Sequence, residues 1–496
     1  MWMQLVGQDE YVRECGTKER QAPDLISISR RMADNSKLHI AMFPWLAFGH
    51  MIPYLELAKL IAQKGHKISF ISTPRNIDRL PKLPPHIAPL INLVKLPLPR
   101  MHNLLEGAEA TSEVPYDKVK YLKQAYDGLK EPLATFLETS RPDWILNDFL
   151  PFWLPEVASR LGISNAFFSI FIAAALSIIK PQHVVEYRTT PEDYAVPANW
   201  IPFPTTVAFR LFEVLKLFDH SISVEETHVT DMYRFEEVIK GCDLIAVRGS
   251  KEFAPEWMQL LEELHGKPVL PVGFLPTTEY DDGEETETWR SVKEWLDKQE
   301  KGKVVYVAFG SEAKPSQDEL TEIALGLELS GLPFFWVLKK RRGLEDTEPI
   351  ELPDGFEERT KGRGIVCITW APQLKILGHD SVGGFLTHSG WSSVVEALQN
   401  QRALILLTFL ADQGLNARVL EENRIAYSIP RNHAHGSFTR DSVAESLRLV
   451  IAEEEGKFYR DKAKEMSSLF GDRDRQDRYV DNLLGYLQSH VKQLKS

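Results

Sequence analysis

Hydrophobic and polar residues follow two alternating periods along this chain, and the alternation predicts a repeated strand–helix unit. The apolar run KLHIAMF at residues 37–43 is typical of a buried strand, and the stretch after it has the apolar period of a helix. Gly65 ends that helix, and the run KISFIS at 67–72 predicts a second strand. Further strands are expected at 144–148, 165–170 and 243–247. Buried strands that alternate with helices predict a parallel sheet with helices on both faces.

A second series of strand-like runs begins after residue 300. Its strands are expected at 303–311, 333–339, 364–370, 382–388 and 403–409. Residues 270–289 separate the two series and are rich in proline, glycine and acidic residues, which is typical of a linker. The pattern therefore predicts an α/β protein with two Rossmann-like domains that face each other across a cleft.

The same pattern predicts the limits of the domains. Residues 1–36 have weak periodicity and mixed charge, which predicts a flexible tail. We expect an N-terminal Rossmann-like domain at 37–269, the linker at 270–289, a C-terminal Rossmann-like domain at 290–475 and, at 476–496, a C-terminal helix that returns to the N-terminal domain. In such sheets ligands bind beyond the carboxyl ends of the strands, so the turns after the strands are the candidate sites.

Composition and charge disfavour several classes of protein. The 496 residues carry a formal net charge of −12, which disfavours nucleic acid or an anionic membrane as a main partner. The longest apolar stretch, 166–179, is shorter than the ~20 residues of a membrane-spanning helix, and the first residues lack a secretory signal pattern. Cys15, Cys242 and Cys367 are widely spaced and odd in number, which indicates a reducing compartment. We therefore expect a cytoplasmic protein without a membrane span.

The strand-to-helix turn HSGW, residues 388–391, has the chemistry of an anion site. Gly390 lets the backbone pass close to a ligand, and Ser392 and Ser393 lie at the start of the next helix, where backbone N–H groups lack partners. His388 can donate a hydrogen bond to the same anion, and Glu396, one turn into the helix, can accept from ribose hydroxyls. On this turn alone, serines that merely cap the helix stay an open alternative.

Neighbouring turns favour a nucleotide sugar over simple capping. Residues 309–311, FGS, form another glycine-serine turn after a strand. Trp370 offers a flat face for a nucleobase, and Asp412 with Gln413 provides acceptors and donors that suit sugar hydroxyls. An aromatic plate, a phosphate turn, a ribose carboxylate and a sugar-binding pair together predict a nucleotide-sugar site.

The stretch from Trp370 to Gln413 resembles the plant secondary product glycosyltransferase signature, which is a long and specific pattern. From about Lys37 to the C-terminus the chain resembles plant UDP-dependent glycosyltransferases of the GT-B fold, and stretches such as RPDWILNDF and VVYVAFGSE are similar to their family 91. The resemblance implies an inverting hexosyltransferase whose partners are a UDP-sugar, as co-substrate, and a small lipophilic plant metabolite. It implies a monomer with no further cofactor and no metal.

The resemblance also implies a donor site whose contacts follow the parts of the UDP-sugar. The uridine contacts are Trp370, Ala371, Gln373 and Glu396. The diphosphate contacts are Ser311, His388, Ser392 and Ser393, in a turn that includes Gly390 and Trp391. The sugar contacts are Asp412 and Gln413.

Three positions depart from the usual pattern of that family. Ser389 replaces a frequent cysteine, Ser392 stands where many members have Asn, and Gln401 occupies a usual glycine position. We expect a shorter or water-bridged phosphate contact at Ser392 and an altered turn at Gln401. None of the three is expected to abolish donor binding.

A catalytic pair is expected in the first domain, because transfer of a sugar to a hydroxyl requires a base near neutral pH. His50 precedes a helix in the first strand–helix loop, where the positive helix end disfavours its protonated form. Asp148 follows the strand WILN at a carboxyl end that faces the cleft. Taken alone, the two residues are better explained as a helix cap and a strand end. In the family resembled here, a histidine and an aspartate at these positions form the catalytic dyad.

Metal dependence and two other functions are disfavoured. The D-x-D at 472–474 lies in a helical stretch of alternating charge, which is typical of a solvated face, and the histidines show no metal-ligand clustering. An NAD(P)-dependent oxidoreductase would need GxGxxG after a strand, and the nearest fragment, GRG at 362–364, precedes one. A catalytically silent binding protein would not need both His50 and Asp148.

The sequence leaves the donor sugar and the acceptor open. Gln413 is in keeping with UDP-glucose, but users of UDP-rhamnose can carry the same Asp-Gln pair. Members similar to family 91 often extend a sugar on a terpenoid or flavonoid glycoside, whereas others glycosylate the aglycone directly. Loops near 101–115, 149–153 and 168–215 are expected to build the acceptor pocket.

The weak periodicity before Lys37 generates a first prediction, because Met32 could serve as an alternative start. Deletion of residues 1–31 should leave the melting temperature and the rate of UDP release nearly unchanged. Differential scanning fluorimetry and a UDP-release assay of the truncated and full-length chains measure both quantities. A large loss in either would mean that the tail packs on the folded domain.

Overall fold

Two parallel sheets organise the part of the chain that this computed structural model describes, which is residues 37–179, 188, 190–217, 229–278, 286–311, 313, 315–338 and 351–492. The contacts within the chain divide it into two units, Met1–Lys37 and Leu38–Ser496, and both sheets belong to the second unit. The predicted tail at 1–36 and Cys15 lie outside the described residues. The sheets confirm the predicted class of two Rossmann-like α/β halves, whereas the predicted domain limits stay predictions.

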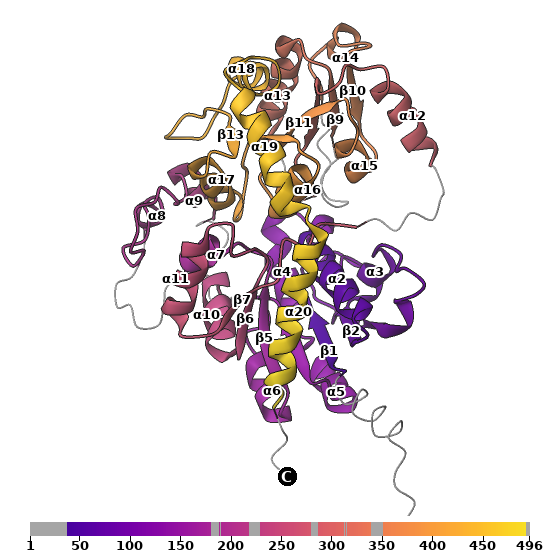
Figure 1. The fold of residues 1–496 in the computed structure, drawn as a ribbon, viewed down its shortest axis with the longest axis vertical. Helices are drawn as coiled ribbons and strands as arrows, with labels where there is room; N and C mark the ends of the chain where they lie inside the picture. The colour runs from indigo at the N-terminus through magenta and orange to yellow at the C-terminus, as the bar shows by residue number, and fades with distance from the viewer. Residues whose placement is uncertain are drawn as a thin grey trace, which may run out of the picture. The chain divides into compact units, whose positions relative to one another are not determined.

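The first sheet has the strand order β3-β2-β1-β4-β5-β6-β7, with neighbouring strands parallel (Figure 1). Its strands are β1 His39–Phe43, β2 Lys67–Ser72, β3 Ile91–Lys95, β4 Trp144–Asn147, β5 Ser164–Ser169, β6 Leu244–Val247 and β7 Val269–Pro271. The order reverses between β1 and β4, and such a switch point leaves a crevice at the carboxyl ends of the two strands. His50 lies in the first turn of α2, Phe48–Gln63, and not before that helix as predicted, whereas Asp148 follows β4 directly as predicted. The predicted dyad therefore lies at this switch point.

The second sheet has the order β10-β9-β8-β11-β12-β13 and is parallel as well. Its strands are β8 Val304–Ala308, β9 Phe334–Val337, β10 Gly364–Cys367, β11 Val382–Thr387, β12 Ala403–Leu406 and β13 Ala426–Ser428. The order reverses between β8 and β11. Ser311 follows β8 and His388 follows β11, so the predicted diphosphate turn lies at the second switch point.

The predicted strands differ from the observed ones at their ends and at the edges of the sheets. The run at 303–311 is a strand only to Ala308, and the run at 364–370 ends at Cys367, so Trp370 lies in a loop. The pattern does not predict β3, β7 or β13. β3 is an edge strand with mostly part-exposed or exposed side chains, and β7 and β13 are short, so none forms the long apolar run of a central strand.

Helices alternate with the strands along the chain, and α18, α19 and α20 follow the last strand. In the first half they are α2 Phe48–Gln63, α3 Pro74–Asp78, η1 Ala88–Leu90, η2 Thr111–Glu113, η3 Tyr116–Lys118, α4 Val119–Asp127, α5 Lys130–Ser140, α6 Leu154–Leu161, α7 Ala173–Ser177, α8 Pro191–Tyr194, α9 Leu211–Leu217, α10 Asp231–Gly241 and α11 Pro255–His265. In the second half they are α12 Glu287–Leu296, α13 Gln317–Ser330, α14 Phe356–Arg359, α15 Gln373–Leu377, α16 Trp391–Gln399, α17 Gln413–Glu422, α18 Arg440–Ile451, α19 Lys457–Phe470 and α20 Arg473–Ser489.

The last helix, α20, packs on the first sheet although it follows the second one in sequence (Figure 1). Its apolar face joins the core formed with β1, β2 and β4 through the buried side chains of Val480, Leu483, Leu484 and Leu487. Trp144 Nε1, from β4, donates a hydrogen bond to Leu487 O (2.9 Å). This contact ties the C-terminal segment to the half of the molecule that carries His50.

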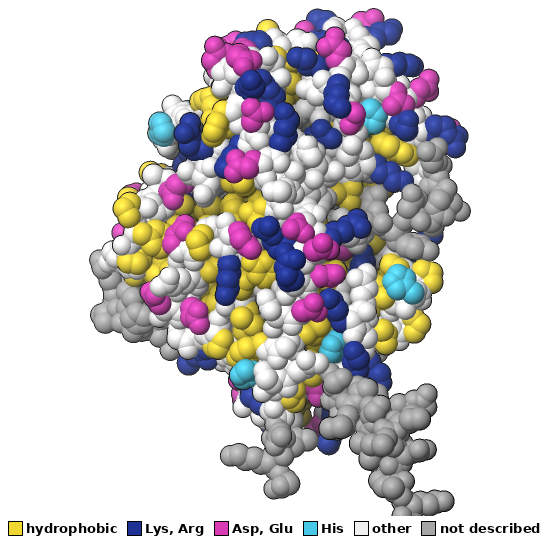
Figure 2. Space-filling model, viewed as in Figure 1, with side chains coloured by type: hydrophobic (Ala, Val, Ile, Leu, Met, Phe, Trp, Pro, Cys, Tyr) yellow, Lys and Arg dark blue, Asp and Glu magenta, His cyan; other side chains and the backbone are white. Residues whose placement is uncertain are grey.

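Two features concern the surroundings of the chain: the distribution of charged side chains on the surface, and the length and apolarity of the helices. Basic and acidic side chains are interspersed over the face that Figure 2 shows, which is typical of a solvated surface. Within the described residues, no helix is both long enough and apolar enough to cross a membrane.

The packing of α20 generates a prediction about stability. Leu483→Ala should lower the free energy of unfolding by about 2–5 kcal/mol, because it opens a cavity in the core under β1 and β4. Leu329→Ala is the matched control, since Leu329 also lies in a helix but is 49% exposed, and it should change the value by less than about 1 kcal/mol. Urea denaturation followed by circular dichroism measures both. Equal effects of the two substitutions would contradict the described packing.

Candidate functional site

A cavity of about 450 Å³ lies at the carboxyl ends of strands from both sheets. Residues after β1, β4, β5 and β6 line one side, and residues after β8, β11 and β12 line the other. The volume is in the range of small-molecule sites. The predicted site residues that line the cavity are His50, Ser311, His388, Gly390, Trp391, Ser392, Ser393, Asp412 and Gln413.

His50 and Asp148 form a hydrogen-bonded pair at the edge of this cavity. His50 Nδ1 lies 2.7 Å from Asp148 Oδ2, and because an ionised carboxylate only accepts, Nδ1 carries the proton. Asp148 is fully buried, whereas the His50 side chain keeps 12% of its surface exposed. The other ring nitrogen, Nε2, is then the basic one, and His50 itself lines the cavity.

Backbone amides hold the Asp148 carboxylate in place. Its Oδ2 also accepts from Trp45 N (3.0 Å), and its Oδ1 accepts from Phe149 N (2.8 Å). These hydrogen bonds satisfy a buried charge that would otherwise be costly, and they fix the direction in which the carboxylate meets His50. The arrangement can therefore orient an imidazole and stabilise the imidazolium that forms when it takes a proton.

The imidazole of His388 lies between Gly310, in the turn after β8, and Gly390, in the predicted diphosphate turn after β11. A Cβ atom at Gly390 would come within 2.4 Å of His388 Nε2, and a Cβ atom at Gly310 would come within 2.7 Å of the same atom. Gly310 also has a φ of 71°, which suits glycine. Both glycines are therefore needed to leave room for the histidine ring. From the sequence alone, Gly390 is expected only to let the backbone pass close to a ligand.

Two of the positions that depart from the resembled family have left-handed backbone. Ser389 has a φ of 68° and Gln401 a φ of 64°, a region that costs most residues other than glycine some free energy. The usual glycine-type turn is therefore kept at Gln401 with a side chain present. Ser389 is fully buried next to the turn.

The predicted uridine contacts are not among the residues that line the cavity. Trp370 is 66% exposed, which leaves the face of its ring open to a ligand. Gln373 Nε2 donates a hydrogen bond to Glu396 Oε2 (2.6 Å), and Gln373 Oε1 accepts one from Tyr306 OH (3.1 Å). Ala371, also in this group, is buried. The structure therefore brings Gln373 and Glu396 together and leaves Trp370 exposed in the loop after β10.

The predicted sugar-binding pair, Asp412 and Gln413, follows β12 at the start of α17. Gln413 Oε1 accepts from two backbone amides, Phe409 N (2.9 Å) and Leu410 N (3.1 Å), so the amide group of Gln413 has a fixed orientation with Nε2 as its donor. Asp412 Oδ2 accepts from Asn416 Nδ2 (2.8 Å). Burial raises the pKa of Asp412, although the Asn416 hydrogen bond and the nearby His50 oppose the shift. Asp412 and His50 thus face the same space from the two halves.

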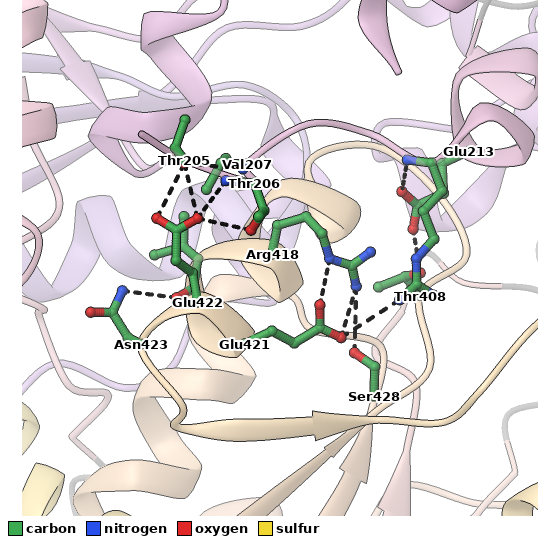
Figure 3. Close-up of polar contacts among 12 residues, drawn as sticks. Thr205, Thr206, Val207, Glu213, Thr408, Arg418, Glu421, Glu422, Asn423 and Ser428 are labelled. Atoms are coloured by element: carbon green, nitrogen blue, oxygen red, sulfur yellow. Dashed lines mark hydrogen bonds and ion pairs between the residues drawn. The ribbon is translucent and has the colours of Figure 1, made fainter. Parts of the chain in front are cut away.

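Side chains from the first half hold this sugar-binding turn (Figure 3). The buried Glu213, on α9, accepts from Thr408 Oγ1 (2.6 Å), four residues before Asp412. A Cβ atom at Gly414 would come within 2.3 Å of Glu213 Oε2, so the carboxylate packs directly on the turn. At the end of α17, Glu422 accepts from the hydroxyl of Thr206 (2.8 Å). These contacts join the turn and α17 to α9 and to the loop before α9.

Comparison with known proteins identifies the family. A family model described as UDP-glucoronosyl and UDP-glucosyl transferase matches residues 266–480. UDP-glycosyltransferase 91A1 of Arabidopsis thaliana is 59% identical over 92% of this chain and 97% of its own length. The chain belongs to family 91 of the plant UDP-glycosyltransferases. It is therefore a hexosyltransferase of an inverting class, and the NAD(P)-dependent oxidoreductase hypothesis is set aside.

Two further relatives bear on the donor and on the fold. The soyasaponin III rhamnosyltransferase of Glycine max is 42% identical over 92% of this chain and 97% of its own length. The solved structure of UGT73P12 of Glycyrrhiza uralensis, in complex with glycyrrhetinic acid 3-O-monoglucuronide, has a TM-score of 0.74 at 23% identity and covers 91% of this chain and 96% of that chain. This likeness confirms the predicted GT-B fold.

Sequence reasoning missed three residues that the structure of this glycosyltransferase brings to the site. Arg248 lines the cavity, Glu213 holds the sugar-binding turn, and Thr277 Oγ1 donates to Glu396 Oε1 (2.8 Å). Only Arg248 has a signal in the sequence, because it directly follows the strand run DLIAV at a carboxyl end. Glu213 and Thr277 act on residues far away in the chain and have no local signature.

Within the described part of the chain, no group of three or more His, Cys, Asp or Glu side chains could hold a metal ion. Within the D-x-D at 472–474, Asp472 caps helix α20, since its Oδ1 accepts from Arg475 N (3.0 Å). The same hydrogen bond lowers the pKa of Asp472.

The His50–Asp148 pair generates a prediction about catalysis. His50→Ala should lower kcat by about 10²- to 10⁴-fold, because the general base is lost, while the affinity for UDP stays within about twofold. A UDP-release assay and isothermal titration calorimetry measure the two quantities. The matched control is His86→Ala, a histidine on the exposed surface, which should leave both unchanged. Normal turnover in His50→Ala would contradict the assignment of His50 as the general base.

Proposed function

We propose that this enzyme transfers glucose from UDP-glucose to a sugar hydroxyl of an existing terpenoid or flavonoid glycoside. The observation that carries the proposal is the 2.7 Å contact of His50 with Asp148 at a cavity that the Asp412–Gln413 turn faces from the other half. A base and a sugar-binding pair on opposite sides of one cavity are what attack on a bound sugar requires.

In the proposed reaction His50 acts as the general base. Its Nε2 takes the proton of the acceptor hydroxyl as that oxygen bonds to the anomeric carbon, while Asp148 stabilises the imidazolium. The bond between the anomeric carbon and the β-phosphate oxygen breaks, and UDP leaves with the electron pair. Attack opposite the leaving group inverts the anomeric carbon.

The proposed donor contacts follow the parts of UDP. Trp370 stacks on uracil through its exposed face, with the Ala371 backbone and Gln373 beside it. Glu396 binds the ribose hydroxyls, a role supported by its fixed carboxylate, which Thr277 and Gln373 already orient. The diphosphate meets the start of α16 and the two neighbouring turns, through Ser311, His388, Gly390, Trp391, Ser392 and Ser393.

Glucose is favoured as the donor sugar by the polar groups of the sugar-binding turn. Gln413 Nε2 is a donor of fixed direction, and Asp412 is an acceptor, so together they suit a sugar rich in hydroxyls. Rhamnose lacks the 6-hydroxyl and has a methyl group in its place. UDP-rhamnose stays the second candidate, because a relative named as a rhamnosyltransferase is 42% identical to this chain.

The acceptor side of the cavity supports a lipophilic substrate. Aromatic and aliphatic side chains form most of its lining, with Phe149 and Phe235 stacked at 4.5 Å between ring centroids and Phe171 in edge contact with both. Such a wall suits a terpenoid or flavonoid skeleton. Direct glucosylation of an aglycone is the alternative acceptor reaction. We further propose a cytoplasmic monomer that needs no cofactor or metal besides the UDP-sugar.

The proposal is tested by UDP release from the purified enzyme. UDP-glucose and UDP-rhamnose are each offered with a panel of aglycones and with the corresponding monoglycosides. The proposal expects turnover with UDP-glucose on the monoglycosides. Turnover on aglycones alone would make the enzyme a first-step transferase, and turnover with UDP-rhamnose alone would replace the donor.

The geometry of Gln413 generates a prediction about donor use. Gln413→His should lower kcat/KM for UDP-glucose about tenfold or more, because the amide donor is lost and the two backbone amides lose their shared acceptor. Gln259→His, on the exposed face of α11, is the control and should leave kcat/KM unchanged. Steady-state kinetics over UDP-glucose concentration measures the effect. Unchanged kinetics in Gln413→His would mean that Gln413 does not touch the sugar.

A further inference from the structure

Arg248 is a buried cation at the cavity that the proposed donor contacts do not include. It follows β6 directly and is 1% exposed. Its Nε donates to Phe274 O (2.7 Å) and its Nη2 donates to Leu275 O (3.2 Å), so two backbone carbonyls fix the plane of the guanidinium. Its Nη1 donates to Ser392 Oγ (2.7 Å). The side chain therefore reaches from the first half of the molecule to the diphosphate turn of the second.

The charge of Arg248 has no carboxylate in direct contact within the described residues. Glu396 and Glu56 attract it from a distance, but the oxygens of Glu396 already accept from Thr277 and Gln373. Burial lowers the pKa of Arg248 to about 10, so the guanidinium stays protonated at neutral pH. A buried cation without an ion-pair partner is costly, which makes the site ready for an anion.

The position of Arg248 matches that of the diphosphate. It lines the cavity together with the proposed diphosphate contacts Ser311, His388, Ser392 and Ser393. Three of its five N–H groups have partners among the described residues, which leaves two for a ligand. The Ser392 hydroxyl accepts from Arg248, so its own proton is left to donate to a phosphate oxygen.

We propose that Arg248 binds the diphosphate of the donor, directly through its remaining N–H groups and indirectly through Ser392. The inference rests on the donor site of the proposed function. Negative charge on the β-phosphate grows as the bond to the anomeric carbon breaks and the electron pair stays on oxygen. A guanidinium held in a buried cleft stabilises this charge more in the transition state than in the ground state. Since Arg248 lies in the first half and the turn lies in the second half, the bound diphosphate contacts both halves of the molecule.

The first test compares the binding of UDP and of uridine, which lacks phosphate, by isothermal titration calorimetry. Arg248→Met should lower the affinity for UDP about 10- to 100-fold and leave the affinity for uridine within about twofold. It should also lower kcat. An unchanged affinity for UDP, or an equal loss for UDP and uridine, would overturn the inference.

Two further variants separate charge from structure. Arg248→Gln keeps a donor toward the carbonyls and removes the charge, so it should lose the preference for UDP over uridine even if the Met variant does not fold. Arg248→Lys keeps the charge and should retain most of that preference. A loss of preference in the Lys variant as large as in the Gln variant would refute the electrostatic role.

Arg234→Met is the matched control. Arg234 is a 2% exposed arginine of the same half, but its guanidinium is paired with Asp127 (2.6 Å). This variant should leave the ratio of UDP affinity to uridine affinity unchanged, and a changed ratio would count against a role specific to Arg248. If the unmodified enzyme itself binds UDP no better than uridine, the proposed donor site fails, whatever the Arg248 variants do.

Discussion

Parallel pairing of the strands is the constraint on which the rest of this glycosyltransferase depends. Because neighbouring strands run in the same direction, the carboxyl ends of each sheet open at one edge, and the chain can place polar side chains there without disturbing the core. His50 and Asp148 are 98 residues apart, yet their atoms meet at 2.7 Å because β1 and β4 are neighbours. In the second sheet β8 and β11 are neighbours in the same way, and the turns that follow them line the same cavity.

Local fields, and not the net charge, suit the cavity to an anion. The whole chain carries a net charge of −12, but the predicted diphosphate turn combines the start of α16 with His388, and the buried Arg248 of the first half donates a hydrogen bond to Ser392. His388 can occupy its place only because Gly310 and Gly390 lack a Cβ atom. Such fixed groups need little reorganisation when negative charge develops on a leaving diphosphate.

Much of the fold could be predicted from the sequence, because central parallel strands are buried on both faces and leave continuous apolar runs. Edge and short strands such as β3 and β13 bury fewer side chains and left no such signal. The turns after the strands, with the helix starts that follow them, contain nine predicted site residues that line the cavity, whereas the predicted uridine contacts do not line it. Trp370 was placed at a strand end, whereas β10 stops at Cys367 and the tryptophan lies in the following loop.

Contacts between the halves could not be predicted in the same way. Glu213 meets Thr408 across 195 residues, and Arg248 meets Ser392 across 144 residues. Such contacts depend on how the two sheets are positioned and on side-chain direction, neither of which a local pattern encodes. For Glu213 the sequence shows only an acidic residue in an amphipathic helix, although its carboxylate packs on the sugar-binding turn.

The roles of His50 and of the α16 turn are tested most directly by a crystal structure of the enzyme with UDP and a flavonoid or terpenoid monoglycoside bound together. We expect a sugar hydroxyl of the acceptor within hydrogen-bond distance of His50 Nε2 and the diphosphate at the start of α16, with Arg248 in contact. A monoglycoside whose sugar points away from His50, or a diphosphate bound away from the α16 turn, would contradict these roles.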